Sequence, residues 1–214
     1  MEIEAKFSIA DQATFQRLIE VQQLAGYGLS PARLKQNHDQ YLDTADSAFL
    51  RRGFACRLRL DEGGGRVLTL KSLTPPQGAL HVRQELEVAL PPLAGLDMAA
   101  WPASDAAALA QEIGRGQPLR LLFDLRQERH QRLAAAGGPP LVELSIDHVH
   151  FSAAAQADCR GVELELLPAG DLAAVQAMTA ELETRWGLAV QPRSKFEQGL
   201  ALARPELLPL SFDR

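Results

Sequence analysis

The chain has 214 residues, of which 46% are hydrophobic, and this is sufficient for one domain with a sizeable core. Its net charge of -5 argues against a general nucleic-acid-binding surface, because such surfaces neutralise many phosphates with Lys and Arg. No apolar run is long enough to cross a membrane, and the charged residue at position 2 leaves no room for a signal peptide, so we expect a cytoplasmic protein without a membrane partner.

The N-terminal segment EIEAKF, residues 2–7, alternates charged and apolar side chains. In an extended strand this pattern places Glu2, Glu4 and Lys6 on one face and the apolar residues on the other. For one isolated segment, the wet face of an ordinary amphipathic strand would be a sufficient explanation. Because the pattern recurs along the chain, a charged site that binds a divalent metal is the better hypothesis.

A helix is predicted to follow from Asp11, its N-cap, to Gly26. Strands are then predicted over residues 37–43, 54–61, 66–73 and 81–90. The glycine-rich stretch 61–65 joins two of them as a hairpin turn. A phosphate-binding loop is the alternative for these glycines, but it would require a Gly-Lys-Ser/Thr motif and a helix directly after them.

The second half of the chain begins with a short helix predicted over residues 104–114. The later elements are strands over 120–134, 141–150 and 160–167, a helix over 171–186 and a short helix that contains Lys195. Most strands of the chain alternate charged with aliphatic residues, and some are acidic whereas others are basic. Adjacent like charges repel unless opposite charge lies between them. A barrel with its charged face inside and helices over its aliphatic face resolves this conflict.

Two cysteines and two histidines are expected to have no part in the charged site. Cys56 and Cys159 are too few for a disulfide framework, and we expect both to be reduced. His148 and His150 have the spacing of metal ligands on a strand. However, His148 has the opposite parity to Asp147, so this pair is expected to face away from the interior.

The basic strands of such a barrel would face a polyanion. A polyphosphate is one example: it carries several negative charges on closely spaced oxygens, so its site must supply several cations. The candidates are Lys6, Arg57, Arg59, Lys71 and Arg129. Arg126 and Arg132 have the opposite parity to Arg129 and are expected to point outward. Mg2+ prefers a few carboxylates together with water and phosphate oxygens, and Mn2+ has similar preferences. The glutamates of the acidic strands match that need.

The ordered set of motifs resembles the CYTH family, the triphosphate tunnel metalloenzymes. The residues that carry the resemblance are Glu2-x-Glu4-x-Lys6, Tyr41-Leu42-Asp43-Thr44, Cys56-Arg57-Leu58-Arg59, Leu70-Lys71, Arg83-x-Glu85-x-Glu87, Arg129, Asp147, Glu163-Leu164-Glu165 and Ser194-Lys195. They follow the family's order along almost the whole chain, which is far more specific than one E-x-E-x-K. The resemblance implies an α+β fold: a closed antiparallel eight-stranded β-barrel, or tunnel, with a charged interior and surrounding helices. It places one domain at residues 1–203 and a C-terminal tail at 204–214.

The resemblance also implies roles for the charged residues. It predicts ligands of Mg2+ or Mn2+ at Glu2, Glu4, Glu165, Glu163 and Asp147. It predicts substrate contacts from Lys6, Arg57, Arg59, Lys71, Arg129, Lys195 and Tyr41. Tyr41 fits equally well as a packing residue at the barrel rim. The predicted catalytic residues are Glu163 and Glu85, either of which could serve as base, and Lys71 and Lys6, which would stabilise charge on phosphate.

The predicted activity is metal-dependent hydrolysis of inorganic triphosphate (tripolyphosphate) to pyrophosphate and phosphate by a monomer or homodimer. The alternatives are a nucleoside or thiamine triphosphatase, a class IV adenylate cyclase, and a non-catalytic polyphosphate-binding module. A cyclase needs a base pocket, which no residue here indicates. A pure anion receptor would gain affinity by losing its carboxylates, which this sequence retains. The helical CHAD domain that relatives often carry is absent from the sequence.

Overall fold

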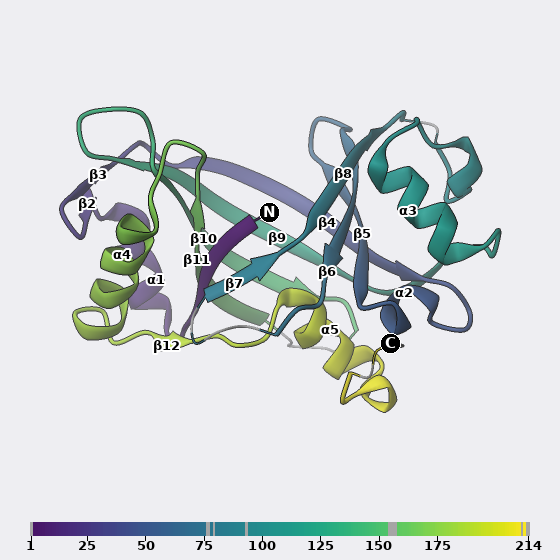
Figure 1. The fold of residues 1–214 in the computed structure, drawn as a ribbon. Coiled ribbons are helices and arrows are strands. Elements are labelled where there is room, and N and C mark those ends of the chain that lie inside the picture. The colour runs from purple at the N-terminus through teal and green to yellow at the C-terminus, as the bar shows by residue number, and fades with distance from the viewer. Residues whose placement is uncertain are drawn as a thin grey trace.

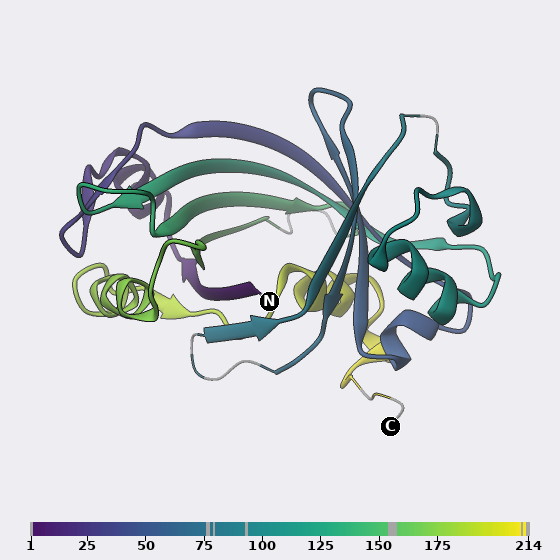
Figure 2. The ribbon, with the colours of Figure 1, turned by 45° about the horizontal axis from the view of Figure 1, so that its top comes forward.

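The computed structural model describes residues 2–75, 78, 80–92, 94–153, 158–210 and 212. Its strands form one strongly curved antiparallel sheet with helices on the outside (Figures 1 and 2). The strands are β1 (Glu2–Ile9), β2 (Gln23–Leu24), β3 (Tyr27–Leu29), β4 (Arg33–Asp43), β5 (Phe54–Asp61), β6 (Arg66–Ser72), β7 (Leu80–Arg83), β8 (Glu85–Leu90), β9 (Arg120–Ala135), β10 (Val142–Phe151), β11 (Asp158–Leu166) and β12 (Ala189–Val190). The order along the sheet is β12-β1-β11-β10-β9-β4-β5-β6-β8.

The sheet closes into a nearly complete barrel because β7 and β8, which follow one another in the chain, pair with strands at opposite edges of the sheet. β8 pairs with β6, where Glu85 lies opposite Lys71, whereas β7 pairs with β1, where Arg83 lies opposite Glu2. The sequence predicts one strand here, over residues 81–90, and the structure divides it at Gln84 because the segment changes partner. The strands of the barrel are thus β1 and β4 to β11, nine in all, or the predicted eight if β7 and β8 are counted as one interrupted strand.

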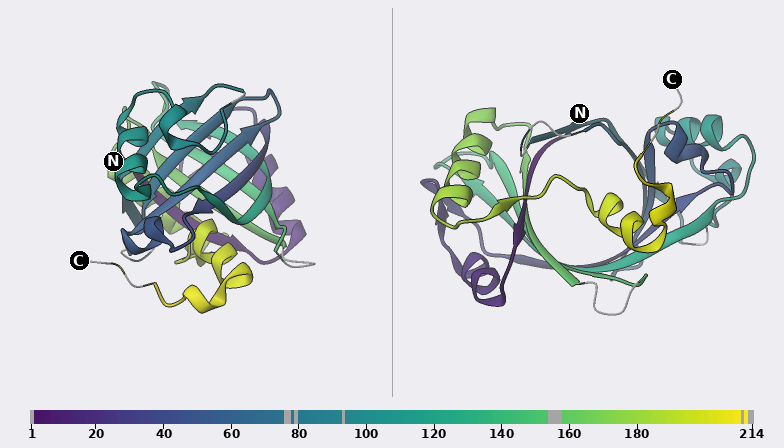
Figure 3. Two further views of the ribbon diagram at one scale, coloured as in Figure 1. Left: turned by 90° about the vertical axis from the view of Figure 1, so that its right-hand side faces the viewer. Right: turned by 90° about the horizontal axis from the view of Figure 1, so that it is seen from below.

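Two groups of helices cover the outside of the barrel, and a further helix lies at one end of it (Figure 3). The helices are α1 (Gln12–Glu20), α2 (Ala48–Arg51), α3 (Asp105–Gly114), α4 (Leu172–Thr184) and α5 (Lys195–Ala203), with 3-10 helices η1 (Met98–Ala100) and η2 (Pro205–Leu207). α1 and α4 pack on β1, β10 and β11, whereas α2 and α3 pack on β5, β6 and β8. None of the described helices is long and apolar enough to cross a membrane.

The pairing of β1 with β11 shows how the barrel separates charge from apolar surface. Lys6 lies opposite Glu163 on the inner face, and Ala5 lies opposite Leu164 on the outer face. Ala5 and Leu164 are fully buried because they belong to the core beneath α1 and α4. Full burial of a side chain such as Leu164 contributes roughly 1.5–3 kcal/mol. The predicted arrangement, charged inside and aliphatic outside, is confirmed.

One end of the barrel interior is apolar, however, which the sequence did not predict. Tyr41 stacks on Phe123 with the ring centroids 4.8 Å apart, and Phe196 of α5 packs against both rings. Leu200 of α5 belongs to the same buried cluster. α5 therefore covers this end, and Figure 3 (right) shows it against the inner edge of the ring.

The first helix is shorter than predicted, because it ends at Glu20 and not at Gly26. The guanidinium of Arg132 donates to the carbonyl oxygens of Ile19, at 3.0 Å, and of Val21, so a residue of β9 satisfies the end of the helix. Gly26, with φ of 82°, turns the chain between β2 and β3 instead. Arg132 points outward as predicted, but it is buried.

The outward parity predicted for the strand histidines is confirmed. His150 Nδ1 lies 2.6 Å and His148 Nε2 3.5 Å from the Asp158 carboxylate, on the outer face of β10 and β11. Cys56 and Cys159 are both free thiols, as expected.

The C-terminal segment packs against α5. Leu207, Leu208 and Leu210 contact the apolar cluster that contains Phe196 and Leu200. Residues 211, 213 and 214 of the predicted tail lie outside the described residues. The domain boundary between residues 203 and 204 stays a prediction.

Candidate active site

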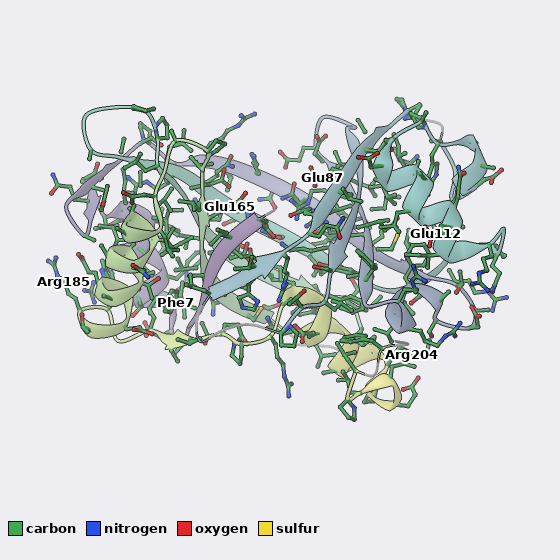
Figure 4. All side chains as sticks on the ribbon, in the orientation of Figure 1. Phe7, Glu87, Glu112, Glu165, Arg185 and Arg204 are labelled. Carbon is green, nitrogen blue, oxygen red and sulfur yellow. The ribbon has the colours of Figure 1, made fainter. Side chains whose placement is uncertain are left out.

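A cavity of 650 Å³ occupies the charged part of the barrel interior. Its acidic lining residues are Glu2, Glu4, Glu85, Glu87, Glu143, Glu163 and Glu165. Its basic lining residues are Lys6, Lys35, Arg57, Arg59, Lys71, Arg83, Arg129 and Lys195. Figure 4 shows Glu165 and Glu87 in the middle of the molecule, between the two helical groups, whereas Arg185 and Arg204 lie at its periphery.

The structure brings the predicted site residues together around this cavity, with one exception. Asp147 does not line the cavity, because Arg129 and Lys195 lie between. Its two oxygens accept hydrogen bonds from Arg129 at 2.8 and 2.7 Å, and one of them also accepts from Lys195 at 2.9 Å. Both oxygens of Asp147 are thus occupied by the two cations, and its predicted metal contact stays a prediction.

Glu163 lies at the centre of a largely buried group of ion pairs. Its carboxylate contacts Lys6 at 2.6 Å, Lys195 at 2.7 Å and Arg129. Burial opposes ionisation of Glu163, but these three cations outweigh it and hold its pKa well below the usual value. A carboxylate held in this way is a weak base. The arrangement therefore favours an orienting role for Glu163 over the predicted role as general base.

Lys71 lies among a second set of carboxylates. Its ammonium contacts Glu2, and it lies 3.2 Å from Glu4 and 3.6 Å from Glu85. Burial and the neighbouring Glu4 raise the pKa of Glu2 to about 7. Burial also disfavours the charged form of Glu4, but Lys6 and Lys71 outweigh it and lower the pKa of Glu4 to about 2. The two glutamates of β1 thus differ sharply in their affinity for a proton.

Negative charge accumulates at the corner formed by β1, β10 and β11. Glu4 lies opposite Glu165, which in turn lies opposite Glu143. Burial raises the pKa of Glu165, and the charges of Glu143 and Glu4 raise it further. Oε1 of Glu4 is buried and accepts no hydrogen bond, although the ammonium of Lys71 lies 3.2 Å from it. Crowded, largely buried carboxylates are a donor set that suits a hard divalent cation, so the residues fit the metal that the fold implies.

These carboxylates do not yet form a metal-binding geometry. Over the described ranges of the chain, no set of three or more His, Cys, Asp or Glu side chains is arranged to hold a metal ion. Lysine ammonium groups lie against Glu2 and Glu4 instead. Glu2, Glu4 and Glu165 would hold a metal only after these contacts change.

The opposite wall of the cavity is basic. Arg59 donates two hydrogen bonds of 2.7 Å to Asp39, which is fully buried. Arg57 lies 3.7 Å from the same carboxylate and donates to the hydroxyl of Thr69 at 3.0 Å. Asp39 therefore fixes the direction of the guanidinium of Arg59. The sequence prediction missed Asp39, although it has the same strand parity as Tyr41.

Two further basic residues of the cavity received no role in the sequence prediction. Lys35 faces the cavity from β4 and forms no ion pair with any described residue, and its parity with Tyr41 was the available signal. Arg83 is 3% exposed and its guanidinium donates to Nδ1 of His81. Burial and Arg83 lower the pKa of His81 to about 4, which keeps it a neutral acceptor.

Tyr41 lines the cavity at its apolar end, where one ring face stacks on Phe123. Burial and the charge of Asp39 raise the pKa of Tyr41 to about 12, so its hydroxyl keeps its proton and can donate. Ring packing is therefore present in the structure, and the predicted phosphate contact stays a prediction.

A barrel with a charged interior, an aliphatic exterior and helices over that exterior defines a tunnel fold of the triphosphate tunnel type. The family model of the CYTH domain matches residues 1–200, so the chain belongs to the CYTH family.

Solved structures show the same fold. HpAC1 from Hippeastrum, described as a candidate adenylyl cyclase with a dominant triphosphatase activity, superposes with a TM-score of 0.70 and 21% identity, over 98% of this chain and 99% of that one. A candidate adenylate cyclase of Bacillus halodurans gives 0.59 and 18%, over 91% and 94%. The PH1819 protein of Pyrococcus horikoshii gives 0.58 and 19%, over 92% and 97%. No protein of curated function matches the sequence significantly.

Proposed function

We propose that this chain hydrolyses inorganic triphosphate to pyrophosphate and phosphate inside its tunnel, with Mg2+ or Mn2+ as cofactor. One observation carries the proposal. Two walls face each other across one cavity of 650 Å³, and one wall has crowded carboxylates whereas the other has arginines. Crowded carboxylates suit a divalent cation, and arginines suit phosphate oxygens. A metal-polyphosphate complex satisfies both walls at once.

The basic residues would bind the phosphate chain from several directions. Arg57 and Arg59 would donate to one end of it, with Asp39 holding Arg59 in place. Arg129 and Lys195 would approach from the side of β9 and α5, where Asp147 orients both. Groups that are already oriented stabilise charge on phosphate without reorganising during the reaction.

The acidic residues would hold the metal and accept the proton of the attacking water. Glu2, Glu4 and Glu165 would bind the metal, which when bound supplies Lewis-acid stabilisation of the phosphate oxygens. Glu85 is our choice for the base, because Glu163 is occupied by three cations. Lys71 and Lys6 would stabilise negative charge on the reacting phosphate.

The cavity offers little free aromatic surface, and this favours inorganic triphosphate over organic triphosphates as the substrate. The only aromatic side chains among its described lining residues are Tyr41 and Phe196, and both pack against Phe123. A base or thiamine ring therefore finds little free aromatic surface on which to stack. The triphosphatase activity ascribed to HpAC1 agrees with this reaction class, and that protein shares only the fold with this chain at 21% identity.

Phosphate release from tripolyphosphate, ATP and thiamine triphosphate, with Mg2+, Mn2+ or EDTA, tests the proposal. We expect metal-dependent release of one phosphate and one pyrophosphate per tripolyphosphate, faster than from either organic substrate. Glu4→Gln should abolish it, whereas Glu128→Gln, on the outer face of β9, should not. Preference for an organic triphosphate, or formation of cyclic AMP, would overturn the substrate assignment. Tight binding without turnover would leave a polyphosphate-binding protein.

The wider assignments are also proposals. We propose a cytoplasmic protein, monomeric or homodimeric, without a nucleic-acid partner. Size-exclusion chromatography with light scattering at several protein concentrations tests the oligomeric state. A mobility-shift titration with RNA and DNA tests the nucleic-acid statement, and a bound complex at physiological salt would contradict it.

A further inference from the structure

The ammonium of Lys71 lies where a small cation would be expected to bind. It contacts Glu2, and lies 3.2 Å from Glu4 and 3.6 Å from Glu85. These three carboxylates come from two strands, β1 and β8, which lie on opposite sides of the barrel closure. The side chain of Lys71 reaches them from β6, which pairs with β8 but not with β1.

Lys71 also lines the cavity, where our proposed function assigns it to the phosphate chain. One ammonium has three donors and one net charge. It cannot neutralise the carboxylates of β1 and a polyphosphate at the same time without losing part of either contact. The two sets of partners therefore compete for Lys71.

Lys6 is not suited to such an exchange. It is held between Glu4 at 2.7 Å and Glu163 at 2.6 Å, and only 8% of its side chain is exposed. The side chain of Lys71 is 22% exposed, and it lines the cavity. Lys71 is thus the ammonium at the acidic corner that is open to an incoming anion.

We propose that Lys71 is an exchangeable internal cation that couples the binding of metal and polyphosphate. Its ammonium neutralises Glu2 and Glu4 and so competes with a divalent metal for them. A polyphosphate draws Lys71 away and thereby frees these carboxylates. Metal and polyphosphate then bind with positive coupling, which by linkage has the same size in both directions. The inference rests on the proposed function only for the identity of the two ligands.

The first test measures Mn2+ binding without any phosphate, by electron paramagnetic resonance or calorimetry. Lys71→Met should tighten Mn2+ binding by about tenfold or more, because the competing ammonium is gone. Lys35→Met is the matched control, since Lys35 lines the same cavity and forms no ion pair with any described residue. The control should change the Mn2+ dissociation constant by less than about threefold. Unchanged affinity in Lys71→Met, or equal changes in both variants, would overturn the proposal.

The second test measures the reverse direction and does not depend on the folding of Lys71→Met. Tripolyphosphate binding is measured by calorimetry in EDTA. Glu2→Gln should release Lys71 and tighten binding by about threefold more than Glu143→Gln does. Glu143 is a matched control because it lies at the same acidic corner and, among the described residues, forms neither an ion pair nor a hydrogen bond with Lys71. Equal effects of the two variants would indicate general charge repulsion and would contradict the exchange.

Neither test requires turnover, so the two proposals can fail separately. If the wild type hydrolyses tripolyphosphate but Lys71→Met does not tighten Mn2+ binding, the proposed function stands and the exchange is wrong. If the binding shifts occur as expected but no triphosphate is hydrolysed, the exchange stands and the proposed enzyme activity is wrong. Circular dichroism of each variant confirms that the barrel has folded.

Discussion

The ammonium of Lys195 lies 2.7 Å from the carboxylate of Glu163, and this contact ties the first residue of α5 to the wall of the barrel. Lys195 also contacts Asp147 at 2.9 Å, so the helix is anchored to β10 as well as β11. α5 begins with a capping box in which Ser194 and Glu197 exchange hydrogen bonds. The cap fixes the start of the helix and with it the position of the Lys195 side chain.

We predict that Glu163→Gln destabilises the protein strongly. Three largely buried cations, Lys6, Arg129 and Lys195, would lose their shared counter-ion. Loss of one partner from a buried ion pair costs about 3–5 kcal/mol, and we expect a loss of about 3 kcal/mol in the free energy of unfolding in urea. Glu112→Gln is the control, because its pair with Arg52 is exposed and should contribute less than about 1 kcal/mol. Similar losses in both variants would contradict the central role of Glu163.

Period-two alternation was sufficient to predict the charged interior, because the parity of a strand residue is fixed locally. The same parity would have placed Lys35 and Asp39 on the inner face of β4 beside Tyr41, and these residues were missed because no motif drew attention to them. The family resemblance supplied the roles, which alternation alone does not give. The distinction between Asp147 and the cavity glutamates depends on partners from β9 and α5, so it was not visible in any local pattern.

Two features of the fold depend on residues that are distant in sequence. α1 ends at Glu20 because Arg132, more than 100 residues further along the chain, takes the carbonyl oxygen of Ile19. The break at Gln84 marks a change of strand partner, and the residues around it retain an ordinary strand pattern. Local propensity and periodicity carry no information about either event.

The raised pKa of Glu2 predicts that metal-free protein loses stability as the pH increases. Its pKa is about 7 in the folded state and 4.5 as the ordinary value, so the native state binds more protons between these values. Its stabilising contribution is fully present below pH 4.5 and is lost as the pH rises through about 7. Glu4, with a pKa lowered to about 2, stays ionised throughout this window and keeps its contribution.

Glu2→Gln should therefore reduce the loss of unfolding free energy between pH 5 and pH 8, by at most on the order of 3 kcal/mol. Urea unfolding in EDTA at both pH values measures the effect. Glu62→Gln, at an exposed position of the turn between β5 and β6, is the control and should leave the pH dependence as in the wild type. If Glu2→Gln retains the full pH dependence, another group is responsible.

Asp39→Asn should weaken substrate binding through Arg59. The substitution removes the charge and one of the two oxygens that accept from Arg59, so the guanidinium loses its fixed direction. On the proposed function, we expect KM for tripolyphosphate to rise about tenfold, with a smaller change in kcat. Asp124→Asn is the matched control, because Asp124 lies 2.6 Å from His38 on the outer face. Steady-state kinetics of both variants test this, and equal changes in KM would rule out a positioning role for Asp39.

Gly199→Ala should destabilise the protein, although helix propensity alone predicts the opposite. Alanine is favoured over glycine inside a helix by about 1 kcal/mol. At position 199, however, a Cβ atom would overlap the ring of Phe123, which is packed against Tyr41 and Phe196. Overpacking of this kind costs about 1–3 kcal/mol, so we expect a net loss of unfolding free energy.

Phe123→Leu provides the test of this explanation. If the overlap causes the loss, the double variant Gly199→Ala with Phe123→Leu should lose less stability than the sum of the two single variants. Urea unfolding of the four proteins gives the coupling energy, which we expect to exceed about 0.5 kcal/mol in favour of the double variant. A stabilised Gly199→Ala protein, or strictly additive effects, would mean that α5 can move away from the barrel without cost. In that case the anchoring of Lys195 to Glu163 would not depend on close packing of the helix against β9.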